Sequence, residues 1–302
     1  MGGSSYSHSS RNLRSHSEGY YTKSANEIFT QNTKRVIHEQ MNPKGVTIRE
    51  SRDSENHPNS IPIIIALDFT GSMGHIPHEL IKDGLPTIMS GIIEHGIPDP
   101  QVLFLGIGDH ECDRAPLQVS QFESGDAELD MWLTRSYIEG GGGGNGGESY
   151  GLAHYFAANH TVTDHWEKRG QKGFLFTIGD EPNLRNYPSR ALNEITGNGD
   201  ISTFTDEEIL AKAQEKWNVY HIMPGKETRN AKQYWTSLLG QNMVWVESGN
   251  KVAEAIRDII ISNTVPYEGS TSNVITESTP DVGTTDTSST SEPDTTTPNI
   301  ML

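Results

Sequence analysis

Residues 68–72 carry three oxygen-bearing side chains at alternate positions. The segment 66–77 is ALDFTGSMGHIP, in which Asp68, Thr70 and Ser72 form the pattern D-x-T-x-S. In a tight turn such side chains can point into one cavity, and a carboxylate with two hydroxyls suits Mg²⁺ or Mn²⁺ with several waters retained. The pattern alone is a weak signal, because an aspartate at this place can also cap a following helix.

Two further segments contain side chains that could complete a cation site. EGGGGGNGGESYGLA at 139–153 is a glycine loop that can bring backbone close to a ligand, and it carries Asn145 and Glu148 before a predicted helix. FTIGDEP at 176–182 places Asp180 after an apolar run. A loop and two strand ends could therefore converge on one cation.

The elements that must position these residues are strands covered on both faces. IPIIIALDF (61–69), QVLFLGIGD (101–109) and GFLFTIGDEP (173–182) are apolar runs of the kind that buried parallel strands require. Predicted helices alternate with them, so we expect 61–265 to form an α/β domain with a doubly wound, mainly parallel sheet and helices on both faces. Ligands bind such sheets beyond the carboxyl ends of the strands, where the strand order reverses, and we expect Asp68 and Asp180 there.

Polar extensions flank this domain. Residues 1–60 are predicted to be an N-terminal arm with a possible short helix within 25–41 and an edge strand in GVTIRES at 45–51. Residues 266–302 are rich in Ser, Thr and Pro and contain Asp and Glu but no Lys or Arg. Such a segment cannot bury a core, and we expect it to be disordered.

Composition limits the function classes. Lys and Arg number 23 against 40 Asp and Glu, giving a formal charge of −17, which argues against nucleic acid as a partner. The single cysteine excludes an internal disulfide. The sequence has no apolar run of membrane-spanning length and no apolar signal segment at its start, so we expect no membrane partner and a cytoplasmic location.

Together the three segments resemble the von Willebrand factor type A domain with its metal-ion-dependent adhesion site. IIIALDFTGSM matches the strand followed by D-x-[ST]-x-S, and GIGDHE, GGGNGGE and GDEP echo later blocks of intracellular, bacterial or phage members in the same order. The resemblance covers about residues 60–264 and implies a Rossmann-like fold. It implies cation ligands at Asp68, Thr70, Ser72 and Asp180.

Asn145 and Glu148 lie in the glycine loop, near the implied site in the sequence. The ligand in the glycine loop of the family falls on Asn145, which departs from the family's Thr or Asp because its oxygen is neutral. Glu148 matches a family Glu that is expected to orient the loop. The segment GDHECD at 108–113 is predicted to form a rim of the site, because a zinc site would need a second Cys or His at ligand spacing.

The resemblance implies a protein-binding module rather than an enzyme. A bound Mg²⁺ or Mn²⁺ with an open coordination position would accept a carboxylate from an Asp or Glu of a protein partner, and the cation would offset the cost of burying that carboxylate. Intracellular members act as adaptors or scaffolds, so the implied partner is an AAA+ ATPase or another assembly component.

Two alternatives stay open. The chain could be a structural or assembly protein of a phage or secretion-type particle. It could also be a metal-dependent hydrolase or phosphotransferase, although haloacid-dehalogenase-type phosphatases need a second Asp where this chain has Thr70. A P-loop enzyme would need a Lys after the glycines, and the glycine loop has none.

Overall fold

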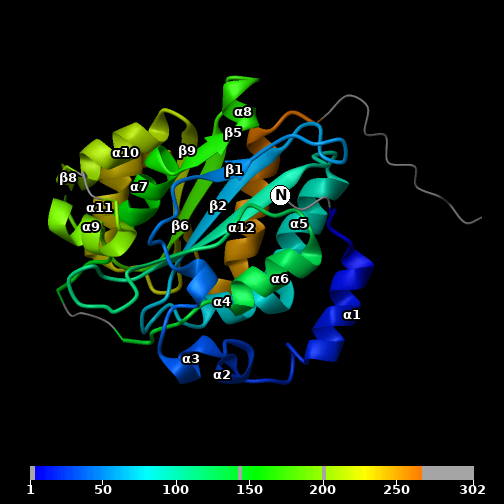
Figure 1. Cartoon of the computed structure of the whole chain (residues 1–302), viewed down its shortest axis with the longest axis horizontal. Helices are drawn as coiled ribbons and strands as arrows, with labels where there is room; N and C mark the ends of the chain where they lie inside the picture. The colour runs from blue at the N-terminus through cyan, green and yellow to red at the C-terminus, as the bar shows by residue number, and fades with distance from the viewer. Residues whose placement is uncertain (1–3, 142–144, 199–201, 267–302) are drawn as a thin grey trace, which may run out of the picture. The chain divides into compact units, whose positions relative to one another are not determined.

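A six-stranded sheet forms the centre of the domain (Figure 1). The computed structural model describes residues 4–141, 145–198 and 202–266. The strand order is β10-β9-β6-β2-β3-β4, and only the β3–β4 pair is antiparallel. The predicted α/β class with a mainly parallel sheet is confirmed. The strands are β2 (Ile61–Asp68), β3 (Pro100–Ile107), β4 (Leu117–Val119), β6 (Gly173–Ile178), β9 (Trp217–Pro224) and β10 (Met243–Val246).

The register of the central strands brings their carboxyl ends level. Asp68 at the end of β2 lies opposite Ile107 of β3, and Leu67 lies opposite Ile178 of β6. The chain passes from β2 to β3 on one side and later crosses to β6 on the other side, so the strand order reverses at β2. Ligand sites of open α/β sheets lie at this reversal.

Helices cover both faces of the sheet, which explains why every residue of β2 is buried. Ile63, Ile65 and Leu67 face one apolar core, whereas Ile64 and Ala66 face the other, as the alternation of side chains along a strand requires. The first core includes α4 (Ile76–Glu79), α5 (Leu85–Glu94), α6 (Asp126–Thr134) and α12 (Val252–Asn263). The second includes α7 (Gly151–Asn159), α9 (Ser189–Thr196), α10 (Asp206–Gln214) and α11 (Arg229–Leu239).

The part of the chain before β2 packs against the domain. Helix α1 (His8–Glu18) buries Arg11, whose guanidinium pairs with Asp130 of α6 at 2.8 Å. In place of one helix within 25–41, the structure has α2 (Ala25–Ile28) and α3 (Gln31–Lys34). Arg35, directly after α3, adopts a left-handed backbone conformation. The predicted tail lies, apart from Pro266, outside the described residues.

Short strands at the margins complete the structure. β1 (Arg49–Ser51), within the predicted edge strand, pairs in parallel with β5 (Thr161–Thr163). β7 (Asn186–Tyr187) pairs with β8 (Phe204–Thr205). Among the helices of the described ranges, none is long and apolar enough to span a bilayer.

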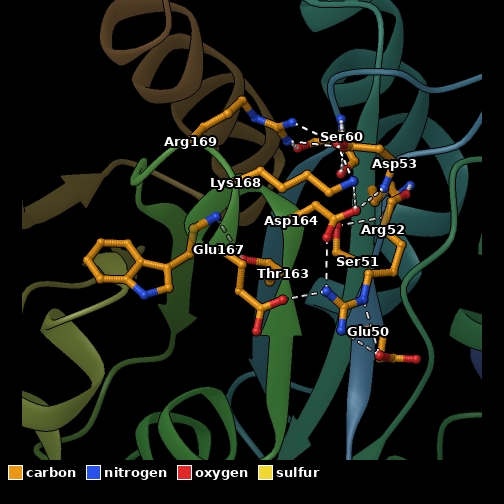
Figure 2. A network of polar contacts seen from close by, with 12 residues as sticks. Glu50, Ser51, Arg52, Asp53, Ser60, Thr163, Asp164, Glu167, Lys168 and Arg169 are labelled. Carbon is orange, nitrogen blue, oxygen red and sulfur yellow. Dashed lines mark hydrogen bonds and ion pairs between the residues drawn. The ribbon is translucent and has the colours of Figure 1, made fainter.

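A network of ion pairs joins β1 and α8 (Asp164–Glu167) at the amino ends of the central strands (Figure 2). Arg169 pairs with Asp53 at 2.8 Å, and Arg52 and Lys168 reach Asp164 at 2.9 and 2.8 Å. Arg169 also donates to the carbonyl oxygen of Ser60, directly before β2. The chain therefore places paired charges at the end of the sheet opposite Asp68.

This network should make stability depend on pH. Burial alone would raise the pKa of Asp53, but hydrogen bonds from Arg169, Ser60 and Lys168 outweigh it and hold that pKa well below its usual range. Such an acid stabilises the fold above its unfolded pKa of about 3.9, and this contribution is lost as pH falls toward the folded pKa. In the wild type, the free energy of unfolding should decrease as the pH is lowered below about 4. We expect this decrease to be smaller in Asp53→Asn, as measured by urea denaturation at several pH values.

The exposed Asp258, which among the described residues pairs with its neighbour Arg257, supplies the control Asp258→Asn. This variant should keep the wild-type pH profile. An unchanged profile in Asp53→Asn would contradict the assigned role of the network.

Candidate metal centre

The first half of the site lies in the turn that follows β2. The Asp68 side chain is only 1% exposed, and its Oδ1 accepts hydrogen bonds from the Thr70 backbone N–H at 2.7 Å and from Thr70 Oγ1 at 2.6 Å. Thr70 is also buried. The turn therefore holds a carboxylate and a hydroxyl together at the end of the strand, as the D-x-T-x-S pattern predicts.

The second half comes from the segment after β6. Ser72 Oγ donates to Asp180 Oδ1 at 2.9 Å, although 108 residues separate them. Ser72 is exposed and Asp180 is half-buried. The structure thus brings Asp68, Thr70, Ser72 and Asp180 to one edge of the sheet as two hydrogen-bonded pairs. Because each hydroxyl gives its hydrogen to a carboxylate, the lone pairs of both hydroxyl oxygens are left available to a cation.

Tyr150 is a member of the site that the sequence analysis missed. Its hydroxyl donates to Asp68 Oδ2 at 2.9 Å, and its fully buried ring packs edge-on against Trp235 and His221. A Cβ atom at Gly179 would lie 1.8 Å from the Tyr150 oxygen, so this position must be glycine. The sign of this contact in the sequence is the glycine directly before Asp180. A glycine is needed there because of the contact with Tyr150, which lies 29 positions earlier in the chain.

Glu148 lies beside this cluster without a compensating charge. The residue is 4% exposed, and its Oε2 is buried with no hydrogen-bond partner among the described residues. Burial, followed by repulsion from Asp68, Asp113 and Asp109, raises the pKa of Glu148 to about 9. Burial also raises the pKa of Asp68 to about 6, and Asp180 adds to it, although hydrogen bonds from Thr70 and Tyr150 oppose the rise.

Basic side chains do not relieve this repulsion. In the part of the chain that the structure describes, no Lys, Arg or His forms an ion pair with Asp68, Glu148 or Asp180. An isolated carboxylate is costly to bury unless a cation or hydrogen bonds compensate it. The donor set of oxygen atoms and the orphaned Glu148 oxygen therefore fit a hard divalent cation.

Asn145 makes different contacts from those of the four predicted ligands. Its Nδ2 donates to Asp109 Oδ2 at 2.7 Å and to Glu111 Oε2 at 3.0 Å. The Asp109 side chain is fully buried at the end of β3, and Asp113 Oδ2 accepts from its backbone N–H at 2.7 Å. Asn145 thus ties the glycine loop to the 109–113 segment, and its place in a metal shell stays a prediction.

The glycine loop approaches the motif through its backbone. The Gly71 N–H donates to the carbonyl oxygen of Gly141 at 2.6 Å, and a Cβ atom at Gly71 would lie 3.3 Å from that oxygen. Gly140 has a φ of +69° and its N–H donates to the carbonyl oxygen of Phe69 at 3.3 Å. Glycine at these positions allows the two loops to meet beside Ser72.

Acidic and imidazole groups alone do not make a metal centre here. Within the described ranges, no three His, Cys, Asp or Glu side chains are grouped so that they could hold a metal ion. A cation at this edge would depend on the Thr70 and Ser72 hydroxyls and on water as well as on Asp68 and Asp180. Mg²⁺ commonly retains several waters and needs only one or two protein carboxylates.

Comparison with known proteins finds only distant similarity. No family model matches, and no curated protein matches. Proximal thread matrix protein 1 from the mussel byssus has a TM-score of 0.45 at 10% identity over 67% of this chain and 48% of its own. The pilus adhesin SpaC from Lactobacillus rhamnosus GG has a TM-score of 0.43 at 10% identity over 71% of this chain and 32% of its own.

Two other solved structures extend this comparison. An aerotolerance-related membrane protein from Bacteroides fragilis has a TM-score of 0.39 at 14% identity over 68% of this chain and 100% of its own. Another structure of the mussel protein, described as having a zinc-occupied MIDAS motif, has a TM-score of 0.45 at 12% identity over 70% of this chain and 49% of its own. The chain thus spans about half of the mussel protein and a third of the adhesin. These similarities are too distant to assign a family or an activity.

The contact between Gly179 and Tyr150 can be tested by a double-mutant cycle. We expect Gly179→Ala to lower the free energy of unfolding by about 1–3 kcal/mol, because the new methyl group collides with the Tyr150 hydroxyl. In a Tyr150→Phe background the cost should be smaller, because the nearest clashing atom is gone. Urea denaturation of the four proteins measures the coupling, and equal costs in both backgrounds would contradict the described geometry.

Proposed function

We propose that this chain is a metal-dependent protein-binding module of the von Willebrand factor type A family that acts as an adaptor or scaffold. One Mg²⁺ or Mn²⁺ binds at Asp68, Thr70, Ser72 and Asp180 and accepts a carboxylate from an Asp or Glu of a protein partner. The observation that carries this proposal is the meeting of oxygen-bearing side chains from two adjacent strand ends, with no ion pair to a basic side chain among the described residues.

The difference in burial between the ligands supports an open coordination position. Asp68 and Thr70 are buried, whereas Ser72 is exposed and Asp180 is half-buried. A cation held between the two pairs would therefore be covered on the side of β2 and accessible from solvent. A carboxylate from a partner can reach such a cation without a rearrangement of the fold, and the cation offsets the desolvation of that carboxylate.

The donor chemistry favours Mg²⁺ or Mn²⁺ over zinc. All four proposed ligands offer oxygen, and structural zinc sites are built mainly from Cys and His. The zinc noted for the mussel protein is a property of that protein and does not decide the metal of this chain.

A non-enzymatic role is part of the proposal. The second acid that a haloacid-dehalogenase-type phosphatase needs is replaced by Thr70, whose hydroxyl already donates to Asp68. A phosphatase assay with Mg²⁺ tests the hydrolase alternative, and turnover that Asp68→Asn abolishes would replace the binding proposal.

A cytoplasmic location of the protein also stays a prediction.

Metal binding should depend on Asp68. We expect isothermal titration calorimetry to show one Mg²⁺ or Mn²⁺ per chain, bound weakly because only two carboxylates contribute, and no detectable binding to Asp68→Asn. Asn has nearly the same shape as Asp, and circular dichroism can verify that the variant is folded. The exposed control Asp258→Asn should bind as the wild type does, and unchanged stoichiometry in Asp68→Asn would remove the site.

Partner binding should depend on the metal and on its hydroxyl ligands. We expect EDTA to release captured protein partners, such as an AAA+ ATPase or another assembly component, and excess Mg²⁺ to restore them. Thr70→Ala should lose the partner, whereas Thr70→Ser keeps the hydroxyl and should retain it. Capture that is insensitive to both EDTA and Thr70→Ala would show that partners bind another face.

A further inference from the structure

A groove of about 530 Å³ lies beside the candidate metal centre. We call it the arginine groove, because Arg35 and Arg114 both line it. Its other walls come from the segment before β2, from the start of the glycine loop and from the turn after Ser72. Its remaining lining residues are Ala25, Asn26, Asn32, Gly74, Tyr137, Ile138, Glu139, Gly140 and Gly141.

The arginine groove and the metal centre share a wall. Gly141, which lines the groove, accepts the N–H of Gly71 within the D-x-T-x-S motif at 2.6 Å. Gly74 lies against Ile138 so closely that a Cβ atom on this glycine would be 3.1 Å from the Ile138 side chain. A partner carboxylate that reaches the cation beside Ser72 would therefore lie next to the wall that the groove and the metal centre share.

The two arginines are exposed and their charges are available to a ligand. Among the described residues, neither the Arg35 nor the Arg114 guanidinium has an ion pair or a side-chain hydrogen bond. Their backbone N–H groups are engaged, that of Arg35 by the carbonyl oxygen of Gln31 and that of Arg114 by the carboxylate of Glu139. Both guanidiniums influence the hydroxyl of Tyr137, which lines the groove with them. Burial and then Glu139 raise the pKa of Tyr137, whereas the positive charges of Arg114 and Arg35 oppose this rise. The Glu139 carboxylate accepts from the backbone N–H groups of Arg114 and Ala115 instead.

The backbone around Arg35 is fixed in an unusual conformation. Arg35 has a φ of 55° and is the one non-glycine residue with positive φ within the described ranges. Such backbone outliers occur where a surrounding structure over-determines them, often at binding sites. Here Asn32 Oδ1 accepts the N–H of Ile138 at 2.8 Å, which ties the loop that carries Arg35 to the wall shared with the metal centre.

We propose that the arginine groove binds a second acidic side chain of the same partner segment whose first carboxylate binds the cation. This inference rests on the proposed function and specifies the partner as an extended segment with at least two acidic residues. Arginine is suited to such a contact because its guanidinium can bind a carboxylate through two parallel hydrogen bonds. A nucleic acid is not the proposed occupant, because under the proposed function the same segment supplies an Asp or Glu carboxylate to the cation.

Two fluorescein-labelled peptides distinguish binding in the arginine groove from binding at the metal centre. One is hexaglutamate and the other is a hexapeptide with a single Glu among glycines; anisotropy at low ionic strength with saturating Mg²⁺ measures their binding to the full chain. The groove variant is Arg35→Asn with Arg114→Gln, since Asn tolerates the left-handed conformation of position 35. The control variant is Arg190→Gln with Arg229→Gln, two exposed arginines of α9 and α11 outside the groove.

We expect the groove variant to bind hexaglutamate about tenfold more weakly than the wild type does. It should bind the single-Glu peptide with the same affinity as the wild type. The control variant should bind both peptides as the wild type does. Equal hexaglutamate affinity in the wild type and the groove variant, with binding still abolished by EDTA, would overturn this inference and leave the proposed function standing.

The remaining outcomes also decide between the two proposals. Hexaglutamate binding that needs the arginines but persists in EDTA would keep an acidic ligand in the groove, but it would overturn both the shared segment and the metal-dependent function. Tighter binding of a labelled hexathymidylate than of hexaglutamate would overturn the acidic segment as occupant. Absence of Mg²⁺-dependent binding by either peptide at millimolar concentration would overturn both proposals.

Discussion

Asp68 is buried with no ion pair to a basic side chain in the described part of the chain, and this is the constraint around which the domain is organised. Its carboxylate ends the central strand, is almost fully buried, and has Glu148 and Asp180 as acidic neighbours. At the other end of the sheet, Arg52, Lys168 and Arg169 pair with Asp53 and Asp164 (Figure 2). Among the described residues, Arg35 and Arg114 near the metal centre form no ion pair with Asp68. The sheet thus has compensated carboxylates at its amino end and uncompensated ones at its carboxyl end.

Several features of the fold are explained by their contacts with or near the Asp68 carboxylate. Tyr150 gives Asp68 one of its hydrogen bonds, and Gly179 lacks a side chain because Tyr150 occupies the space. Gly71 lets the glycine loop approach the motif. The parallel register of β2 and β6 sets Ser72 and Asp180 within hydrogen-bond distance. A cation would complete this arrangement by supplying the charge that the protein omits.

Much of the architecture could be predicted from the sequence because it follows from local patterns. Continuous apolar runs that end in Asp68 and Asp180 indicate buried parallel strands, and the reversal of strand order places their ends together. The N-terminal region was harder to predict. Its helix α1 is mostly polar, and it docks through the buried Arg11–Asp130 pair, a contact between residues far apart in the sequence. Tyr150 was missed for the same reason, since a tyrosine before a helix has no local sign of a contact with Asp68.

Sequence patterns were least informative for the residues that surround the candidate metal centre. The family resemblance implies a ligand at Asn145, and this stays a prediction. The structure adds contacts that the resemblance does not imply: the amide nitrogen of Asn145 donates to Asp109 and Glu111 in the loop after β3. The arginine groove could not be predicted either, because Arg35 and Arg114 lie 79 positions apart and are brought together only by the packing of the N-terminal segment.

Anomalous diffraction from crystals grown or soaked with Mn²⁺ can show whether a divalent cation binds among Asp68, Thr70, Ser72 and Asp180. We expect one strong anomalous peak at this end of the sheet, absent from crystals treated with EDTA. A well-ordered site with no peak there, or a peak bound only by Asp109, Glu111 and Asn145, would contradict it.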